Sequence, residues 1–234
     1  MRGTIIGLFL VSIPLQLPAA NLPDPDVDEA FALITNARQN RAEGYFYRAE
    51  AQYKRALAIV EQRSGEQSPD LTPVLNGLAE LYFEAHRYSE AEALSRRSAV
   101  VVEAALGAGH PLLATALHDL AAIYHVQGQF AKAEPIYRRA LAIREAALGP
   151  DHPFVAATLF DLAEMECAQG NSEQAAEHYA RVIQIRQQAF GRDDPRVAEA
   201  LKGYAAALRK TCHRHEAAVA DARARQIMAK TAFR

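Results

Sequence analysis

The chain has no excess of charge of either sign, because 26 Lys and Arg residues stand against 28 Asp and Glu residues. A protein that binds nucleic acid usually carries a basic surface, so the composition gives no indication of DNA or RNA as a partner. Glycine and proline are few, at 12 and 11 residues, and low-complexity tracts are lacking. Half of the 234 residues are apolar and alanine is abundant, which favours closely packed helices over strands. We therefore expect an all-α protein.

The N-terminal segment differs in kind from the rest of the chain. A short positive start precedes an apolar stretch from Thr4 to Leu17. A run of about 14 apolar residues is too short to span a bilayer comfortably but matches the hydrophobic region of a secretory signal peptide. We expect residues 1–20 to be a signal peptide and residues 21–25 a linker, with export to a bacterial periplasm or out of the cell. The alternatives are an uncleaved membrane anchor and an apolar N-terminus on a cytoplasmic protein.

Glycine and proline recur with a period of 42 residues. The two columns are Gly65, Gly107, Gly149 and Gly191, and Pro69, Pro111, Pro153 and Pro195. A fixed period of about 20 to 50 residues indicates a repeat architecture. Glycine is enriched just past a helix end, where it accepts a left-handed conformation, and proline is favoured at the first helical position. Each glycine therefore ends one repeat and each proline begins the next. The predicted array covers residues 26–234, with repeats at about 26–67, 68–109, 110–151, 152–193 and 194–234.

The residue before each proline is expected to cap the helix that follows it. These residues are Ser68, His110, His152 and Asp194. Serine and aspartate are strong N-caps, whereas histidine is a weaker one. Inside the third repeat, apolar residues follow helical spacing at Leu117, Leu120, Ala121 and Tyr124. A second stripe follows a turn that contains Gly128, so each repeat is expected to be two helices joined by a turn.

Two segments of the chain carry a family resemblance. They read HPLLATALHDLAAIYHVQGQFAKAEPIYRRALAIREAALG and HPFVAATLFDLAEMECAQGNSEQAAEHYARVIQIRQQAFG, and both resemble the 42-residue tetratricopeptide repeats of kinesin light chain and of many bacterial proteins. The resemblance covers about residues 25–234. It implies a right-handed superhelical solenoid of five helix-turn-helix repeats, with the first helices on the concave face. It also implies a non-enzymatic scaffold that binds a partner protein or peptide, with no cofactor and no small-molecule substrate.

The family's concave columns map onto a stripe of side chains in this sequence. We predict a partner-binding groove formed by Arg38, Arg41, Asn76, Glu80, Phe83, His118, His125, Phe160, Glu164, Lys202 and Arg209. The stripe is basic at each end and aromatic and weakly acidic in its middle, which would suit a peptide with an apolar centre between acidic flanks. The alternative is a solvated surface without a ligand. Asn76 alone matches the Lys and Asn set by which some members of the family hold a C-terminal carboxylate, so that mode of binding is not expected.

Two other kinds of function remain open. One is self-association through the convex face or the ends of the solenoid. The other is a metal or catalytic site in the groove, where His118 and His125 lie two turns apart and Cys167 occupies the next repeat's equivalent of His125. Because none of these spacings matches a known site motif, we expect neither a metal nor an enzyme. The cluster of residues 212–215, with one Cys and two His, reads as a polar turn.

The two cysteines and the two ends of the array give further expectations. Cys212 corresponds to a position three residues after Cys167, one repeat earlier, so the pair could form a disulfide that contributes about 3 to 4 kcal/mol. Two free thiols are the alternative. Asp221 and Arg225 replace apolar residues in the last helix, which indicates a solvated cap. In the first repeat, polar side chains replace apolar ones at positions 36 and 40, so we expect that repeat to be the least stable.

Overall fold

The computed structural model describes residues 25–231, which form five pairs of α-helices. The first helices of the pairs are α1 (Pro25–Ala42), α3 (Thr72–Glu84), α5 (Pro111–Val126), α7 (Pro153–Gln169) and α9 (Pro195–Lys210). The second helices are α2 (Phe46–Ser64), α4 (Tyr88–Leu106), α6 (Phe130–Leu148), α8 (Ser172–Phe190) and α10 (Arg214–Thr231), and a 3₁₀ turn, η1 (Pro69–Leu71), precedes α3. The predicted all-α array of five repeats is confirmed. The predicted signal peptide, residues 1–20, lies outside the described residues. Within residues 25–231, no helix is long and apolar enough to cross a membrane.

The residues before the four prolines act as N-caps, of α5, α7 and α9 and, for Ser68, of the 3₁₀ turn η1 that precedes α3. The backbone N–H two residues further on donates to the side chain of each cap, at 3.2 Å for Ser68, 3.2 Å for His110, 3.1 Å for His152 and 2.9 Å for Asp194. In both histidines the acceptor is Nδ1, which must therefore carry no proton. Histidine thus caps a helix at this position in the same way as serine and aspartate do.

The glycine column also takes a positive φ, as predicted, but in a different region of backbone space. Gly65 has φ 85° and ψ 162°, and its three equivalents lie within 10° of these values. This extended region is open almost only to glycine, whereas the left-handed helical region also admits asparagine. The column therefore tolerates no other residue without strain.

The turn inside each repeat needs a positive φ as well, and two repeats lack the glycine. Gly44, Gly128 and Gly170 supply it in the first, third and fourth repeats. His86 and Cys212 adopt φ values of 58° and 67° at the equivalent positions. A side chain in this conformation costs about 1 to 2 kcal/mol per residue.

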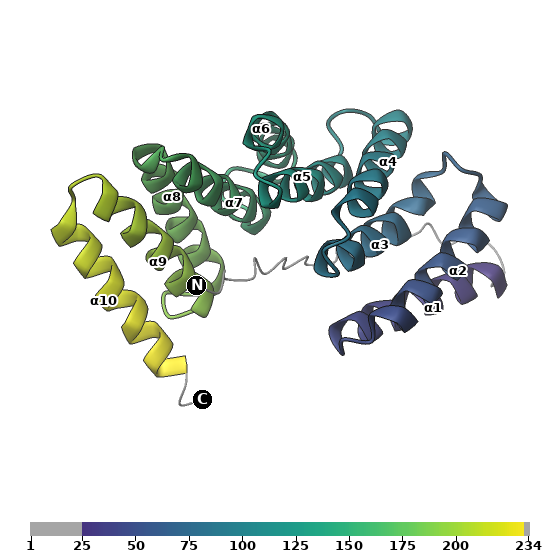
Figure 1. Ribbon diagram of the computed structural model, residues 1–234, viewed down its shortest axis with the longest axis horizontal. Helices are drawn as coiled ribbons and strands as arrows, with labels where there is room; N and C mark the ends of the chain where they lie inside the picture. The colour runs from purple at the N-terminus through teal and green to yellow at the C-terminus, as the bar shows by residue number, and fades with distance from the viewer. Residues whose placement is uncertain (1–24, 232–234) are drawn as a thin grey trace.

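The helix pairs stack into an arch (Figure 1). Each first helix contacts the next first helix, from α1 to α9, whereas no two second helices come into backbone contact within the described residues. The first helices therefore lie closer together and form the inner, concave side, and α4 and α6 lie on the outer side (Figure 1). This arrangement confirms the expectation that the first helices line the concave face.

The two end junctions of the array are closed by a tyrosine that packs on a glycine. Tyr53 of α2 faces Gly77 of α3, and Tyr179 of α8 faces Gly203 of α9. A Cβ atom placed on either glycine would lie 2.5 Å from Cε1 of the facing tyrosine. Glycine at these positions is therefore required by the close approach of an aromatic ring. We call these contacts the end junctions.

The two middle junctions differ at the same positions. At the position of Gly77 and Gly203, the third and fourth repeats carry Asp119 and Asp161. Their counterparts across the junction are Ser95 of α4 and Tyr137 of α6, and all four side chains are buried. We call these contacts the middle junctions, and they bring carboxylates into the body of the array.

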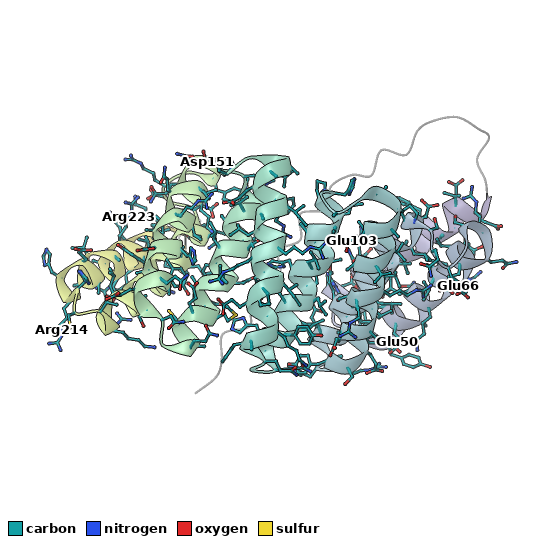
Figure 2. All side chains as sticks on the ribbon, turned by 90° about the horizontal axis from the view of Figure 1, so that it is seen from above. Glu50, Glu66, Glu103, Asp151, Arg214 and Arg223 are labelled. Atoms are coloured by element: carbon teal, nitrogen blue, oxygen red, sulfur yellow. The ribbon has the colours of Figure 1, made fainter. Side chains whose placement is uncertain are left out.

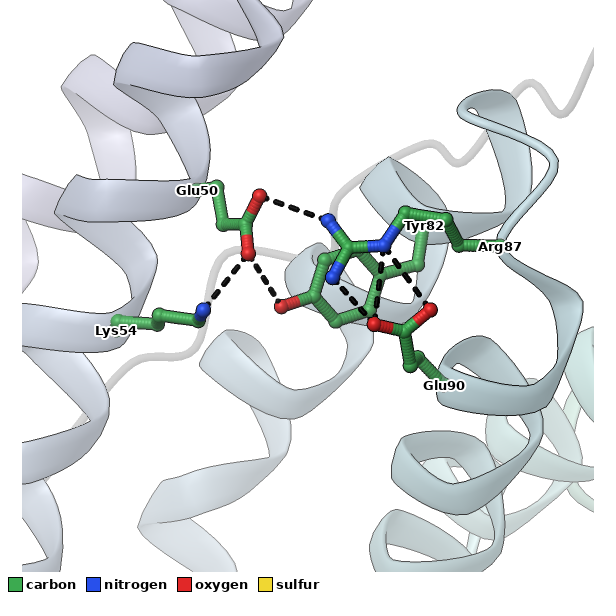
Figure 3. Close-up of polar contacts among 5 residues, drawn as sticks. All are labelled: Glu50, Lys54, Tyr82, Arg87 and Glu90. Atoms are coloured by element: carbon green, nitrogen blue, oxygen red, sulfur yellow. Dashed lines mark hydrogen bonds and ion pairs between the residues drawn. The ribbon is translucent and has the colours of Figure 1, made fainter.

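A hydrogen-bonded cluster joins the first two repeats along one edge (Figure 3). Glu50 of α2 accepts hydrogen bonds from Tyr82 at 2.9 Å and Arg87 at 2.9 Å, and Lys54 lies 2.7 Å from it. Arg87 also pairs with Glu90 and lies 4.0 Å from the centroid of the Tyr82 ring. Burial raises the pKa of Glu50, but the hydrogen bonds from Lys54, Tyr82 and Arg87 outweigh it and hold the pKa at about 2. The cluster is fully paired and serves to hold the repeats together.

Candidate partner-binding face

The outer face of the arch carries a ladder of ion pairs that repeats with the period of the chain. Each pair joins the second helices of two successive repeats: Glu61 with Arg97 at 2.7 Å, Glu103 with Arg139 at 2.5 Å and Glu145 with Arg181 at 2.6 Å. Figure 2 looks onto this face and labels Glu103. Long side chains thus bridge helices whose backbones do not touch, and they leave these charges of the outer face matched.

The predicted stripe lies on the inner face, and its side chains are exposed, partly exposed or buried. Arg38, Lys202 and Arg209 are exposed, and His118 and Phe160 are buried. The other six predicted residues, Arg41, Asn76, Glu80, Phe83, His125 and Glu164, are partly exposed. The structure therefore brings the stripe together on one side of the arch but does not leave all of it accessible.

The basic ends of the stripe are partly neutralised by neighbouring carboxylates. Arg41 pairs with Glu80 and lies 3.9 Å from a carboxylate oxygen of Glu84. Arg209 pairs with Asp221 at 2.5 Å. Arg41 and Arg209 are thus less free to hold acidic flanks of a ligand than the sequence indicated.

Two residues predicted to be available to a ligand are instead covered. Phe160 is 9% exposed, because the guanidinium of Arg186 lies 4.6 Å from its ring centroid and the ring of Tyr179 packs against its other side at 5.6 Å. His118 is 6% exposed, and its Nε2 lies 2.7 Å from Oδ2 of Asp161. The prediction that these two side chains are accessible is wrong, because each is held by a residue of the adjoining helices.

Asn76 is occupied as well, since its side-chain oxygen accepts a hydrogen bond from Ser98 of α4 at 2.7 Å. Phe83 packs edge-to-face against Tyr88, with ring centroids 5.7 Å apart, but keeps some exposure. The partly exposed acidic members of the stripe are therefore Glu80 and Glu164.

The structure reveals a buried charge cluster that the sequence analysis missed. His118 lies between Asp161, at 2.7 Å from Nε2, and Asp119, at 3.7 Å from Nδ1. Arg144 of α6 is 3% exposed and donates hydrogen bonds to Thr158 Oγ1 at 2.6 Å and to the carbonyl of residue 154 at 3.1 Å. Buried ionic groups need such partners, because an unpaired charge in the interior costs several kcal/mol, about 3 to 5 on loss of one partner.

The pKa values of three groups on this face are shifted by burial and by neighbouring charges. Burial and Arg144 lower the pKa of His118, but Asp119 and Asp161 outweigh them and leave it raised. Burial raises the pKa of Glu80 to about 7 in spite of Arg41, and burial together with Asp161 raises the pKa of Glu164 to about 7. The inner face thus holds two carboxylates whose ionisation is opposed mainly by burial.

A signal for the missed residues exists in the sequence. The column of Tyr53, Tyr137 and Tyr179 is interrupted by Ser95 in the second repeat. The partner column reads Gly77, Asp119, Asp161 and Gly203, so the change of residue type coincides with the change of junction. Comparing the two columns across repeats, and not along one helix, would have identified both aspartates.

The thiols and histidines do not assemble into a reactive site. Burial raises the pKa of the Cys167 thiol and lowers that of His125, so Cys167 is kept protonated. Of the two alternatives for the cysteines, the structure has two free thiols: Cys167 is partly buried in α7, and Cys212 is exposed in the turn that follows α9, at its positive φ. In residues 25–231, no group of three or more His, Cys, Asp and Glu side chains is arranged to hold a metal ion.

Comparison with known proteins gives the same architecture. The tetratricopeptide repeat family matches residues 28–99, 72–146, 112–185 and 158–230. The nearly identical TPR-like repeats of a candidate kinesin light chain from Podosopora anserina are 23% identical, cover 92% of this chain and 100% of their own, and give a TM-score of 0.75. BtubC (BKLC) from P. vanneervenii is 22% identical, covers 89% of this chain and 93% of its own, and also gives 0.75.

A third solved structure, YrrB, is described as a TPR protein with an unusual peptide-binding site. It is 18% identical, covers 87% of this chain and 88% of its own, and gives a TM-score of 0.53. At these identities the solved structures show the fold alone, and a comparison with curated proteins gave no match. The family matches, however, overlap from residue 28 to residue 230 across all five helix pairs, and so the chain belongs to the tetratricopeptide repeat family.

Proposed function

We propose that the protein is a non-enzymatic scaffold that binds a peptide or an extended segment of a partner protein on its inner face. The observation that carries this proposal is the contrast between the two faces. The outer face matches its charges in a ladder, whereas on the inner face Glu164 accepts no hydrogen bond from any described residue and neither oxygen of the buried Asp119 has a hydrogen-bond partner among the described residues. Buried polar atoms without partners are rare in proteins, and a ligand is one explanation of them.

The chemistry of this face favours a partner with basic residues in its centre. Glu80, Asp119, Asp161 and Glu164 lie along α3, α5 and α7. Among residues 25–231, the buried cationic side chains are Arg144 and, when protonated, His118. The expectation of an apolar ligand centre thus gives way to that of a positively charged one. The peptide-binding site named for YrrB is consistent with such a use of the fold.

Selection of peptides from a random display library on the immobilised protein tests the proposal. Selected peptides should shift backbone NMR signals of α3, α5 and α7 and leave those of α4 and α6 unchanged. Peptides that map to the outer face, or a library that yields no binder, would contradict it. A paired control is Arg139→Gln, which opens one pair of the outer ladder and should not change affinity.

Self-association through the outer face or the ends is the second candidate. Val219 and Met228 of α10 are large apolar side chains that are exposed, which favours the C-terminal helix as its site. Light scattering decides between the two: a stable dimer that Val219→Lys dissociates supports self-association, and a monomer at high concentration supports the scaffold alone.

Export is proposed on the N-terminal pattern alone. Protein recovered from its native source should have lost about 20 residues if residues 1–20 act as a cleaved signal peptide. Intact mass spectrometry gives the answer, and an unprocessed N-terminus in a soluble cytoplasmic fraction would contradict it.

A further inference from the structure

The junction between the third and fourth repeats lies at the centre of the arch, where α5 and α6 meet α7 (Figure 1). Tyr137 of α6 keeps the tyrosine of the end junctions, but Asp161 of α7 takes the place of the glycine. Oδ2 of Asp161 lies 2.7 Å from Nε2 of His118 in α5. Two first helices are therefore joined here by a pair whose charge depends on the protonation of a histidine.

Both ring nitrogens of His118 face carboxylates. Asp161 lies at Nε2, and Oδ1 of Asp119 lies 3.7 Å from Nδ1. A carboxylate offers only acceptors, and a neutral imidazole carries a proton on only one of its two nitrogens. The neutral ring would turn a lone pair toward one carboxylate, whereas the protonated ring presents an N–H to both. The geometry of this site thus suits the protonated ring.

The buried charges balance only when His118 is protonated. Its side chain is 6% exposed, and those of Asp119, Asp161 and Arg144 are 6%, 7% and 3% exposed. The two carboxylates are then matched by Arg144 and the imidazolium, and loss of the proton leaves two negative charges against one positive charge. Arg144 cannot move closer without giving up Thr158, to which it donates a hydrogen bond at 2.6 Å. An excess of charge in a buried site is unfavourable.

The other groups around this site do not supply a further cation. The ring of Tyr137 packs edge-on against the imidazole at 5.6 Å, and burial raises the pKa of Tyr137 well above its usual value. On the side of α4, the third repeat meets the uncharged Ser95. Glu80 of α3 and Glu164 of α7 interact with the two aspartates, and each has a pKa of about 7. Their ionisation adds negative charge beside the site as the pH rises.

We propose that the junction between the third and fourth repeats is a pH-sensitive hinge, closed while His118 is protonated and loosened when His118 loses its proton. Burial and Arg144 lower the pKa of His118, but Asp119 and Asp161 outweigh them and leave it raised. The stability that the protonated ring contributes is therefore full below the unfolded value of 6.5 and is lost as the pH rises through the folded value. Loosening lets the first three repeats move relative to the last two, which changes the curvature of the inner face. The hinge operates with or without a ligand on that face.

The first measurement is an NMR titration of the histidine rings in the full chain, which gives the pKa of His118 directly. The hinge requires a value above 6.5. A lower value would overturn the proposal, because the ring would then be neutral in the folded protein at neutral pH.

Native-state hydrogen exchange then locates the effect along the array. After correction for the intrinsic dependence of exchange on pH, amides of α6 and α7 at this junction should lose about tenfold or more of their protection between about pH 5.5 and 8.5. Amides at the end junctions should keep theirs. No loss at this junction, or an equal loss at the end junctions, would overturn the proposal.

Variants tie the effect to His118. Asp119→Asn keeps the shape of the side chain and balances the site with a neutral ring, so it should lower the pKa of His118 and abolish the pH dependence of protection. His118→Gln imitates the neutral ring and should leave the junction loosened at both pH values. The matched control is His178→Gln, which breaks a pair with Glu166, at 2.8 Å, inside the fourth repeat and should preserve the pH dependence. Full pH dependence in a folded Asp119→Asn variant would overturn the proposal, even if His118→Gln fails to fold.

Two further measurements separate a hinge from titration of the inner-face carboxylates. In Glu164→Gln the loss of protection with rising pH should persist, and its disappearance would assign the effect to Glu164 and reject the role of His118. Small-angle X-ray scattering should show a change of shape between about pH 5.5 and 8.5 in the wild type and none in Asp119→Asn. Scattering of the wild type that does not change with pH would overturn the hinge.

Discussion

The end junctions and the middle junctions of this array solve the same packing problem in different ways. At the ends, a buried tyrosine lies directly on a glycine of the next repeat. In the middle, Asp119 and Asp161 take the place of the glycines, and His118 and Arg144 are buried with them. All the repeats adopt the same backbone fold, so the difference between the two kinds of junction comes from their side chains. It indicates that close packing of a ring on a glycine joins the end repeats, whereas buried charged groups take part in joining the middle ones.

The largest effect is expected from breaking the charge cluster of the middle. Asp161→Ala leaves His118 and Arg144 without this carboxylate in a buried site, so the free energy of unfolding near pH 6 should fall by about 3 to 5 kcal/mol. Glu199→Ala is the control, because Glu199 is exposed and pairs with Arg186 at 2.9 Å, which is worth at most about 1 kcal/mol. Urea unfolding measures the loss of stability in both variants. Equal losses would show that the buried cluster contributes no more than an exposed ion pair.

A smaller effect is expected at the end junctions. Gly77→Ala and Gly203→Ala each push a methyl group into a tyrosine ring, and overpacking of this kind costs about 1 to 3 kcal/mol. The better helix propensity of alanine offsets part of this, by about 1 kcal/mol. Gly109→Ala meets no atom within 4 Å and should be nearly neutral. A stability gain at Gly77, as helix propensity alone would give, contradicts the described contact.

The variant Glu164→Gln tests how the charge of this inner-face carboxylate affects the stability of the protein at different pH values. The pKa of Glu164 is raised to about 7 in the folded protein, so the stability that its neutral form contributes is full below the unfolded value of 4.5 and is lost as the pH rises through 7. Glutamine imitates the neutral acid and should stabilise the protein near pH 8 by about 1 to 2 kcal/mol, with no gain near pH 4. Thermal unfolding at the two pH values checks this. A gain of the same size at both would mean that the charge of Glu164 is not the cause.

The smallest expected effect concerns the turns within repeats. His86→Gly and Cys212→Gly relieve a positive φ, and each should stabilise the protein by about 0.5 to 1 kcal/mol. The Cys212 variant has a second use, because loss of a disulfide would destabilise the protein by about 2 to 5 kcal/mol instead. If Cys212→Gly is less stable than the wild type under oxidising conditions, the result would indicate a disulfide between Cys167 and Cys212, which the structure does not contain.

What the sequence predicts well depends on local backbone geometry. The repeat boundaries follow from the positive φ of Gly65 and its equivalents and from capping by residues such as Asp194, and neither depends on distant contacts. Burial of His118 and Phe160 could not be predicted, because it is set by Asp161 and Arg186 on other helices. Periodicity shows which face of a helix a side chain occupies, but not which neighbour covers it.

The most direct test of the account converts a middle junction into an end junction. In Ser95→Tyr, Asp119→Gly the tyrosine ring gains the glycine on which its equivalents pack, and the unpaired acceptors are removed. The free energy of unfolding of this double variant, measured with urea, is the deciding measurement. The account predicts a protein at least as stable as the wild type, because a packed ring replaces buried polar atoms that lack hydrogen bonds. A double variant that is less stable than the wild type would contradict it.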